Sequence, residues 1–241
     1  IYRDSIVSLA EFLLESHIKT SRGVLPYRTQ NKDLVFVDAI GMVCPFLARY
    51  GKEYQSRDAT ELAVIQITDF IKYGMDSVSG LPYHAYHSET CEKLGSIGWG
   101  RGVGWLLYGI VDALEFIPKT HPDYKIIFSN FHCLVDNIEQ YQDCFGYFRW
   151  HIIDENSHID TSATAMIGYA IARGGAIGLL ENQYLSIAQN ALNALKISTN
   201  LDGSIRDCSG ECIGLGKYSQ EFGVFPWAQG PATGLAAIIG K

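Results

Sequence analysis

The sequence lacks the features that mark membrane, fibrous and nucleic-acid-binding proteins. No uninterrupted apolar stretch approaches the roughly 18–20 residues that a membrane-spanning helix needs, and its 19 basic residues form no run. Its 26 acidic residues give a net charge of −7, so we expect no nucleic-acid or membrane partner bound through a basic face. With 47% apolar and 19% charged residues over 241 positions, the chain is neither disordered nor a coiled coil. We interpret residues 1–241 as a single globular domain.

Metal and nucleotide signatures are also scarce. Cys208 and Cys212 are spaced as metal ligands could be, but no second Cys/His pair accompanies them, so two loop thiols are favoured. The glycines of Trp99-Gly-Arg-Gly-Val-Gly-Trp105 lack the lysine that follows in a phosphate-binding loop. We therefore expect no metal and no cofactor. The chain opens with an amphipathic helical pattern and no secretory leader, which makes a cytoplasmic location the default expectation.

A recurring phrase, in which a glycine ends a helix and an aromatic-rich segment follows, sets the architecture. It starts at Gly23, Gly80, Gly146 and Gly203, which are 57, 66 and 57 residues apart. Self-similarity at a nearly fixed period is typical of repeat proteins. The repeating unit here is interpreted as one helical hairpin.

Two kinds of helix are predicted around each phrase. Those before it have apolar residues at helical spacing and a polar face, as in outer helices; they include Ile6–Leu14, Leu62–Ile71, 124–141 and 182–195. Those after it are rich in small residues and apolar nearly all round, as in buried inner helices; they cover 37–50, 102–116, 161–173 and 231–239. Strands are expected only within the short phrases.

The predicted fold class is therefore all-α, an (α/α) toroid of helical hairpins. Four outer and four inner helices are fewer than a closed six-hairpin ring requires. Either the ring is open, or a partner or further N-terminal helices complete it, so a homo-oligomer stays an alternative.

The loops that enter the inner helices should converge on one end of such a ring. Polar and aromatic residues gather at these entries, and their combination suits sugars, whose apolar faces stack on aromatic rings while charged groups bond the hydroxyls. The candidate pocket residues are Asp38, His84, Tyr86, His87, Trp99, Arg101, Trp150 and Asp160.

Structural roles could also explain several of these residues. Asp38 and Asp160 stand where helix-capping aspartates are common, although their place in a repeated pattern favours a pocket. His84 and His87 lie in one short extended phrase, so one of them could face the pocket and the other away from it.

The motifs resemble the family of unsaturated glucuronyl and rhamnogalacturonyl hydrolases (glycoside hydrolase families 88 and 105). The matching segments are Val37-Asp-Ala-Ile-Gly-Met42, Pro45-Phe-Leu-Ala-Arg-Tyr50, Gly80-Leu-Pro-Tyr-His-Ala-Tyr86, Trp99-Gly-Arg-Gly-Val-Gly-Trp105, Asp160-Thr-Ser-Ala-Thr-Ala-Met166 and Gln229-Gly-Pro231. The resemblance implies an (α/α)6 barrel whose members carry further N-terminal helices. It also implies removal of a terminal 4,5-unsaturated uronic acid from oligosaccharides: an acid protonates the vinyl ether, water adds, and the resulting hemiketal opens.

The resemblance implies two catalytic aspartates, and this sequence departs from it at one of them. Asp38 matches the first, whereas His87 stands where the second, the acid/base, is expected. His87 is assigned as acid/base because histidine titrates near neutral pH; Glu89 or Asp38 could instead take this role, or the activity could be lost. His84, Tyr86, Trp99, Arg101, Trp150 and Asp160 are assigned to substrate binding.

The leading hypothesis is thus a glycoside hydrolase acting on oligosaccharides that contain uronic acid. The alternative is a catalytically altered saccharide-binding or polysaccharide-assembly protein on the same scaffold. Both require Asp38, His87, Arg101 and Asp160 to gather around one saccharide.

Overall fold

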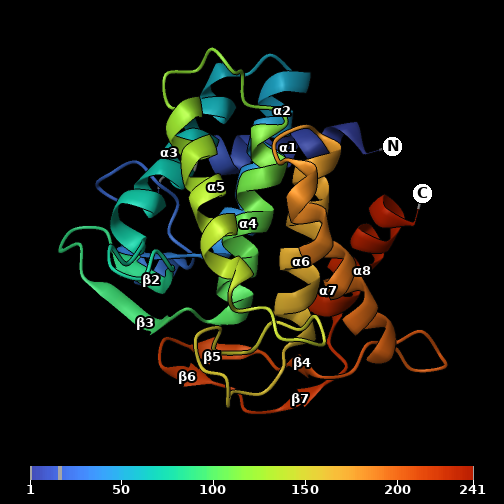
Figure 1. Ribbon diagram of the computed structural model, residues 1–241. Helices are drawn as coiled ribbons and strands as arrows, with labels where there is room; N and C mark the ends of the chain where they lie inside the picture. Colours follow the sequence, from blue (N-terminus) through green and yellow to red (C-terminus); the bar gives the residue numbers. More distant parts are fainter. Residues whose placement is uncertain (1, 16–17, 241) are drawn as a thin grey trace.

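Inner and outer helices alternate along the chain, as the repeat predicts (Figure 1). The computed structural model describes residues 2–15 and 18–240. The inner helices are α2 (Asp38–Glu53), α4 (Gly100–Leu114), α6 (Thr161–Ala176) and α8 (Pro226–Ile239). The outer helices are α1 (Arg3–Glu15), α3 (Arg57–Gly74), α5 (Tyr124–Glu139) and α7 (Leu185–Ile197), and short 3-10 helices span Thr29–Asn31 and Asn182–Tyr184. The predicted all-α class, built of helical hairpins, is confirmed.

Small residues allow the inner helices to pack closely in chain order. α2 packs against α4, α4 against α6, and α6 against α8. A Cβ atom added at Gly109 of α4 would lie only 2.4 Å from the carbonyl oxygen of Ile40 in α2. The backbones of α2 and α4 therefore lie so close together that only glycine fits at position 109. The many small residues of the inner helices predict this close packing.

The outer helices bury one face and expose the other. In α3, the Ser56 side chain caps the first turn by accepting a hydrogen bond from the amide of Ala59 (3.3 Å). Ile67 and Phe70 of the same helix are fully buried, whereas Ile65 is 38% exposed. The apolar stripe of each outer helix thus joins the apolar core that the inner helices share.

The strands differ from the expectation that they lie only within the glycine-aromatic phrases. β2 (Tyr83–His87) overlaps such a phrase, but its partners β1 (Leu34–Phe36) and β3 (Lys93–Ile97) do not. Two further antiparallel pairs follow α7: β4 (Cys208–Ser209) with β7 (Phe222–Gly223), and β5 (Cys212–Gly214) with β6 (Lys217–Tyr218). The prediction was wrong because a strand needs a hydrogen-bonded partner, and segments without the phrase supply the partners here.

The last inner helix begins five residues earlier than the predicted start at Pro231. Pro226 occupies its first turn, where a missing N–H is no loss because that group would have no partner inside the helix. Trp227 and Gln229, which precede the predicted start, therefore lie within α8.

The strands and the entry loops gather towards one end of the helices: β4 to β7 lie below the helices in Figure 1, and β2 and β3 lie at their lower left. Val37, just before α2, donates its amide to the carbonyl of His84 in β2 (2.9 Å). Thr161, which opens α6, donates its amide to Asp207 (3.0 Å). The predicted convergence of the entries at one end is thus present. No helix of the described segments is long and apolar enough to cross a membrane.

One acidic side chain on the inner layer is expected to make stability depend on pH. Asp112 accepts hydrogen bonds from the hydroxyl of Tyr169 (3.1 and 3.2 Å) and lies 3.7 Å from Nε of Arg173. Burial raises the pKa of Asp112 to about 6, although Tyr169 and Arg173 oppose the shift. The folded protein therefore binds this proton more tightly than the unfolded chain does.

Because its folded pKa is raised, Asp112 should lower the free energy of unfolding as pH rises from about 4 to about 6. Urea unfolding across this pH range gives the free energy of unfolding of the wild type and of Asp112→Asn. The difference between the two values measures the contribution of the Asp112 carboxyl group. We expect the stability of the wild type relative to the variant to fall with rising pH. A constant difference would contradict this.

Candidate active site

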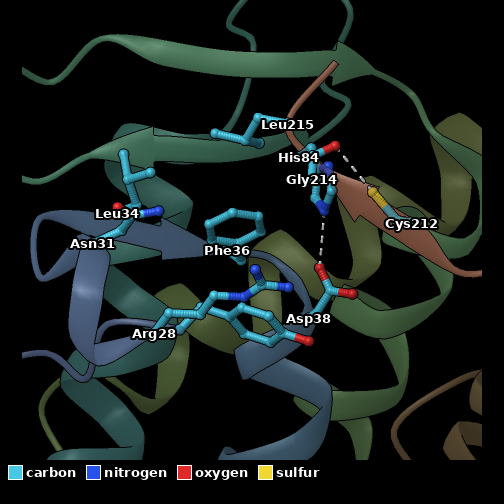
Figure 2. A pocket seen from close by; sticks show the side chains of 10 residues that line it. Arg28, Asn31, Leu34, Phe36, Asp38, His84, Cys212, Gly214 and Leu215 are labelled. Atoms are coloured by element: carbon cyan, nitrogen blue, oxygen red, sulfur yellow. Dashed lines mark hydrogen bonds and ion pairs between the residues drawn. The ribbon is translucent and has the colours of Figure 1, made fainter. Parts of the chain in front are cut away.

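A cavity of about 260 Å³ lies at the end of the helices where the strands gather. Figure 2 shows its lining side chains, which come from the segment before α2 and the first residue of α2, from β2 and from the β5–β6 hairpin. They are Tyr27, Arg28, Asn31, Leu34, Phe36, Asp38, His84, Cys212, Gly214 and Leu215. The chain thus brings residues 27–38, 84 and 212–215 together around one space.

Asp38 and His84 face each other in this cavity (Figure 2). Asp38 is the first residue of α2, where the helix dipole favours a negative charge. Its Oδ2 atom lies 3.2 Å from Nε2 of His84, yet it has no aligned hydrogen-bond partner among the described residues. Asp38 is only 9% exposed and His84 only 2%. A buried carboxylate oxygen is therefore left available to a proton or to a bound molecule.

The surroundings of His84 favour its protonated form. Burial by itself lowers the pKa of the imidazole, but contacts with Asp38 and Cys212 outweigh burial and raise this pKa above its ordinary value. The imidazole of His84 therefore keeps its proton to a higher pH than an ordinary histidine does, which suits a group that takes part in general acid–base chemistry.

Aromatic rings form one side of the cavity and the support behind His84. Tyr27 and Phe36 stack with ring centroids 4.9 Å apart, and Phe36 meets the His84 ring edge-on at 5.0 Å. Trp99, at the start of α4, packs against His84 at 4.6 Å and is 2% exposed. Trp99 thus lies behind His84 and does not line the cavity itself.

Arg101 anchors the segment that leads into the β5–β6 hairpin. Its guanidinium donates to the carbonyl and hydroxyl of Ser209 (2.8 and 2.6 Å) and to the carbonyl of Gly210 (2.9 Å). The same group lies between the rings of Trp99 and Trp227, at 4.7 and 5.2 Å from their centroids. Arg101 is 4% exposed, so it holds the segment in place from beneath.

Asp160 meets the same segment and caps α6. Its carboxylate accepts hydrogen bonds from the amide and hydroxyl of Ser162 (2.9 and 2.6 Å) and from the amide and hydroxyl of Ser209 (3.2 and 2.7 Å). Asp160 is fully buried. Asp160 thus caps α6, as an aspartate at a helix start often does, and it also binds the segment that contains Ser209.

β2 directs its side chains to different environments. His84 lines the cavity, whereas Nδ1 of His87 accepts hydrogen bonds from the amides of Glu89 and Thr90 (3.3 and 3.4 Å) in the following turn. One histidine thus faces the cavity and the other does not, as strand alternation predicts. Tyr86 is fully buried and its hydroxyl donates to Asp69 of α3. The pairing of β2 with β3 shifts in register between Tyr83 and Ala85, where β3 has one residue more than β2.

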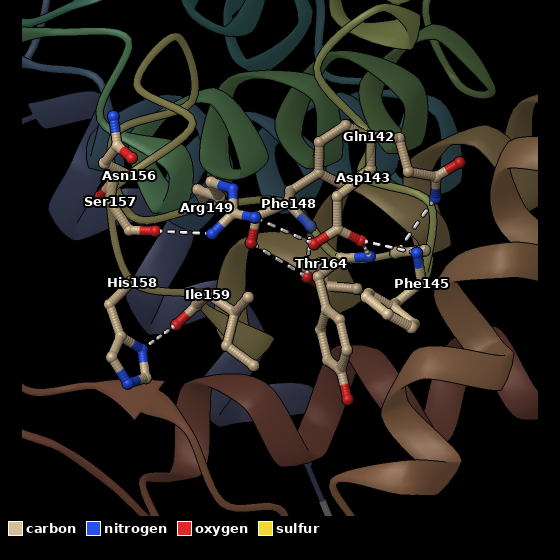
Figure 3. A network of polar contacts seen from close by, with 12 residues as sticks. Gln142, Asp143, Phe145, Phe148, Arg149, Asn156, Ser157, His158, Ile159 and Thr164 are labelled. Atoms are coloured by element: carbon tan, nitrogen blue, oxygen red, sulfur yellow. Dashed lines mark hydrogen bonds and ion pairs between the residues drawn. The ribbon is translucent and has the colours of Figure 1, made fainter.

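Trp150 lies in a loop between α5 and α6 that its own polar contacts brace. In Figure 3, Arg149 donates to the carbonyl of Ser157 (2.8 Å) and pairs with Asp143 (3.4 Å). The Trp150 ring is half-buried against Tyr218 of β6, with centroids 5.5 Å apart. Trp150 therefore supports the hairpin from outside the cavity.

The four residues expected around one saccharide are not brought together. Asp38 lines the cavity, Arg101 and Asp160 meet at Ser209 behind it, and His87 caps a turn. Leu215 and Tyr218 of the hairpin could not be found from the sequence, because nothing local in residues 212–218 indicates contact with β2. Within the described ranges, no three His, Cys, Asp or Glu side chains are placed to hold a metal ion.

Known proteins resemble this chain in sequence and in fold. The family model of Glycosyl Hydrolase Family 88 matches residues 1–232. The fold of helical hairpins, the carboxylate of Asp38 at the start of α2 and this match together place the protein among the glycoside hydrolases. The chain belongs to glycosyl hydrolase family 88.

Individual relatives agree with this assignment. The unsaturated rhamnogalacturonyl hydrolase YesR of Bacillus subtilis is 27% identical over 99% of this chain and 71% of its own length. A possible member of the GH105 family from Salmonella enterica has the same fold, with a TM-score of 0.89 and 21% identity over 99% of this chain and 65% of that one. The unsaturated glucuronyl hydrolase of Bacillus sp. GL1 has a TM-score of 0.73 and 15% identity, over 98% of this chain and 67% of that one. The chain thus spans about two-thirds of the length of these solved structures.

Proposed function

We propose that the protein removes a terminal 4,5-unsaturated uronic acid from oligosaccharides in the cavity that Asp38 and His84 line. Family membership and the named activity of YesR support this class of reaction. The observation that carries the proposal is the Asp38 carboxylate: it is buried, it lies 3.2 Å from an imidazole nitrogen, and its Oδ2 has no aligned hydrogen-bond donor in the described chain.

The reaction needs a group that donates one proton to the substrate and regains one from water. Asp38 and His84 share this proton, and Oδ2 of Asp38 delivers it to C4 of the vinyl ether. Water then adds at C5 and returns a proton to the pair, so the enzyme ends as it began. The hemiketal formed at C5 opens by breaking the bond between C5 and the ring oxygen, which leaves a ketone at C5 and a hemiacetal at C1. Breakdown of this hemiacetal to an aldehyde breaks the glycosidic C1–O bond, and the rest of the oligosaccharide leaves with a hydroxyl group. His84 takes the part that the sequence analysis assigned to His87, because His84 is the histidine that faces Asp38.

The other lining residues suit a uronic acid. Arg28 brings a guanidinium, which can pair with the sugar carboxylate through two hydrogen bonds. Tyr27 and Phe36 offer aromatic surface to the apolar face of the ring. We therefore propose an oligosaccharide ending in an unsaturated uronic acid as the substrate. A cytoplasmic location and a homo-oligomeric state stay predictions of the sequence.

Turnover of lyase products tests the proposal directly. Pectin and glycosaminoglycans digested with polysaccharide lyases provide unsaturated disaccharides, and loss of the ultraviolet absorbance of their C4=C5 bond reports hydration. We expect this absorbance to fall with at least one disaccharide. The matched saturated disaccharide is the control, and it should stay intact because it has no vinyl ether to protonate. Tight binding by calorimetry without turnover of any disaccharide would instead identify a saccharide-binding protein.

A further inference from the structure

The β5–β6 hairpin carries a tyrosine that the reaction outlined above does not use. Cys212, Gly214 and Leu215 of this hairpin line the cavity, and Tyr218 ends it. The Tyr218 ring packs among His84, Trp99 and Trp150, with centroid distances of 5.4, 5.6 and 5.5 Å. A residue distant in sequence is thus held firmly against the cavity histidine.

The hydroxyl group of Tyr218 has two polar neighbours: one can only donate a hydrogen bond, and the other can donate or accept one. The backbone amide of Ser96 in β3 lies 2.8 Å away and can only donate. Nδ1 of His84 lies 2.9 Å away. Because the amide occupies an acceptor position on the oxygen, the hydroxyl hydrogen is free to be donated to Nδ1. Burial raises the pKa of Tyr218 to about 12, so the hydroxyl keeps this hydrogen at neutral pH.

The direction of this hydrogen bond determines which nitrogen of the neutral His84 ring carries hydrogen. A ring nitrogen that accepts a hydrogen bond has no hydrogen of its own. With Nδ1 accepting from Tyr218, the hydrogen of the neutral ring lies on Nε2. Nε2 is the atom 3.2 Å from Oδ2 of Asp38. The line of contacts from Ser96 through Tyr218 and His84 therefore places a hydrogen on the ring nitrogen that lies nearest the carboxylate.

The position of the hydroxyl depends on a glycine opposite it. Gly95 of β3 has a φ of +80°, a conformation that residues with a side chain rarely adopt. A Cβ atom at this position would lie 2.7 Å from Cβ of His84 and 2.9 Å from the Tyr218 hydroxyl. The absence of a side chain at Gly95 thus leaves the space in which the tyrosine hydroxyl and the histidine meet.

We infer that Tyr218 is a positioning residue that holds neutral His84 in the tautomer with hydrogen on Nε2, the ring nitrogen nearest to Asp38. The structural part of this inference stands alone, whereas its consequence for turnover rests on the proposed function. Tyr218 acts through His84 and need not touch the substrate.

Nitrogen NMR of ¹⁵N-histidine-labelled protein reads the tautomer directly. The His84 signals are assigned by their loss in His84→Gln and recorded above the imidazole pKa in the wild type, Tyr218→Phe and Tyr54→Phe. We expect the Nε2–H tautomer in the wild type and a mixture of both tautomers in Tyr218→Phe. Tyr54→Phe is the matched control, since Tyr54 stacks on Tyr50 at the far end of α2, about 24 Å along the helix from Asp38.

Kinetics on an unsaturated disaccharide separate positioning from binding. In Tyr218→Phe, kcat should fall about tenfold, the size expected when one hydrogen bond between buried groups is lost, while KM stays nearly constant. A wild-type His84 with hydrogen on Nδ1, or a Tyr218→Phe variant with the wild-type tautomer, would overturn the inference. If the tautomer changes as expected but the wild type turns over no disaccharide, the inference stands and the proposed function fails.

Discussion

Replacing Asp38 with asparagine is expected to lower kcat by about 10²–10⁴-fold, the contribution of a positioned acid or base. An amide has nearly the shape of the carboxyl group but cannot accept and return the proton that the addition of water requires. The fold should be retained, because Oδ2 of Asp38 has no aligned hydrogen-bond partner in the described chain that the exchange would break. Initial rates on an unsaturated disaccharide, with thermal unfolding recorded alongside, measure both effects.

The control for this variant is an aspartate in the first turn of another helix. Asp58 lies in the first turn of α3 and is exposed, so Asp58→Asn should leave kcat unchanged. NMR titration adds a readout that does not depend on turnover. Without the Asp38 carboxylate, burial is expected to lower the pKa of His84 relative to the wild type, since Asp38 is one of the groups that raise it. An active Asp38→Asn enzyme would refute the assignment of Asp38 as catalytic.

Gly109→Ala is expected to lower the free energy of unfolding by about 3 kcal/mol, the upper part of the usual range for overpacking. The added Cβ would lie 2.4 Å from the carbonyl oxygen of Ile40 and 2.8 Å from the amide nitrogen of Gly41. Backbone atoms cannot rotate away as a side chain can, so α2 and α4 would have to separate. Urea unfolding of the purified variant measures the loss.

Gly175→Ala is the matched control for this effect. The added Cβ would meet only the end of the Leu185 side chain, at 2.8 Å, and that methyl group can turn aside. We expect a change in unfolding free energy of less than about 1 kcal/mol, because alanine also favours the helix by a similar amount. Equal losses in Gly109→Ala and Gly175→Ala would show that the backbone contact between α2 and α4 is not what limits packing.

Gly109→Ala is also expected to reduce activity in whatever protein remains folded. α2 carries Asp38 at its first residue, and a displacement of about 1 Å at a catalytic group can cost about 100-fold in rate. The close contact between α2 and α4 at Gly109 therefore helps to position the Asp38 carboxylate at the start of α2.

The helices could be predicted because their signal is local. Apolar residues at helical spacing mark α3, and the small residues of α4 mark a helix that packs on both sides. The first turn of α8 was missed because Pro226 and Trp227 look like loop residues in sequence, whereas proline fits the start of a helix well. The strands β1 and β3 were missed because their pairing depends on β2, not on their own composition.

The candidate site was predicted in part. Asp38 and His84 were both named, and the structure places them 3.2 Å apart. Arg101 and Asp160 were expected at the saccharide because charged residues at helix entries suggest a pocket. The structure instead satisfies both charges with Ser209, a residue that no pattern near either of them indicates.

The order of the helices, their buried faces and the end at which polar residues gather all follow from periodicity and composition, which each segment carries within itself. The partners around the cavity do not follow in this way. Tyr218 meets His84 across 134 residues of chain, and the folded chain brings His84, not Tyr86 or His87, to the carboxylate. Such pairings depend on how distant segments fold back on one another, so they became visible only in three dimensions.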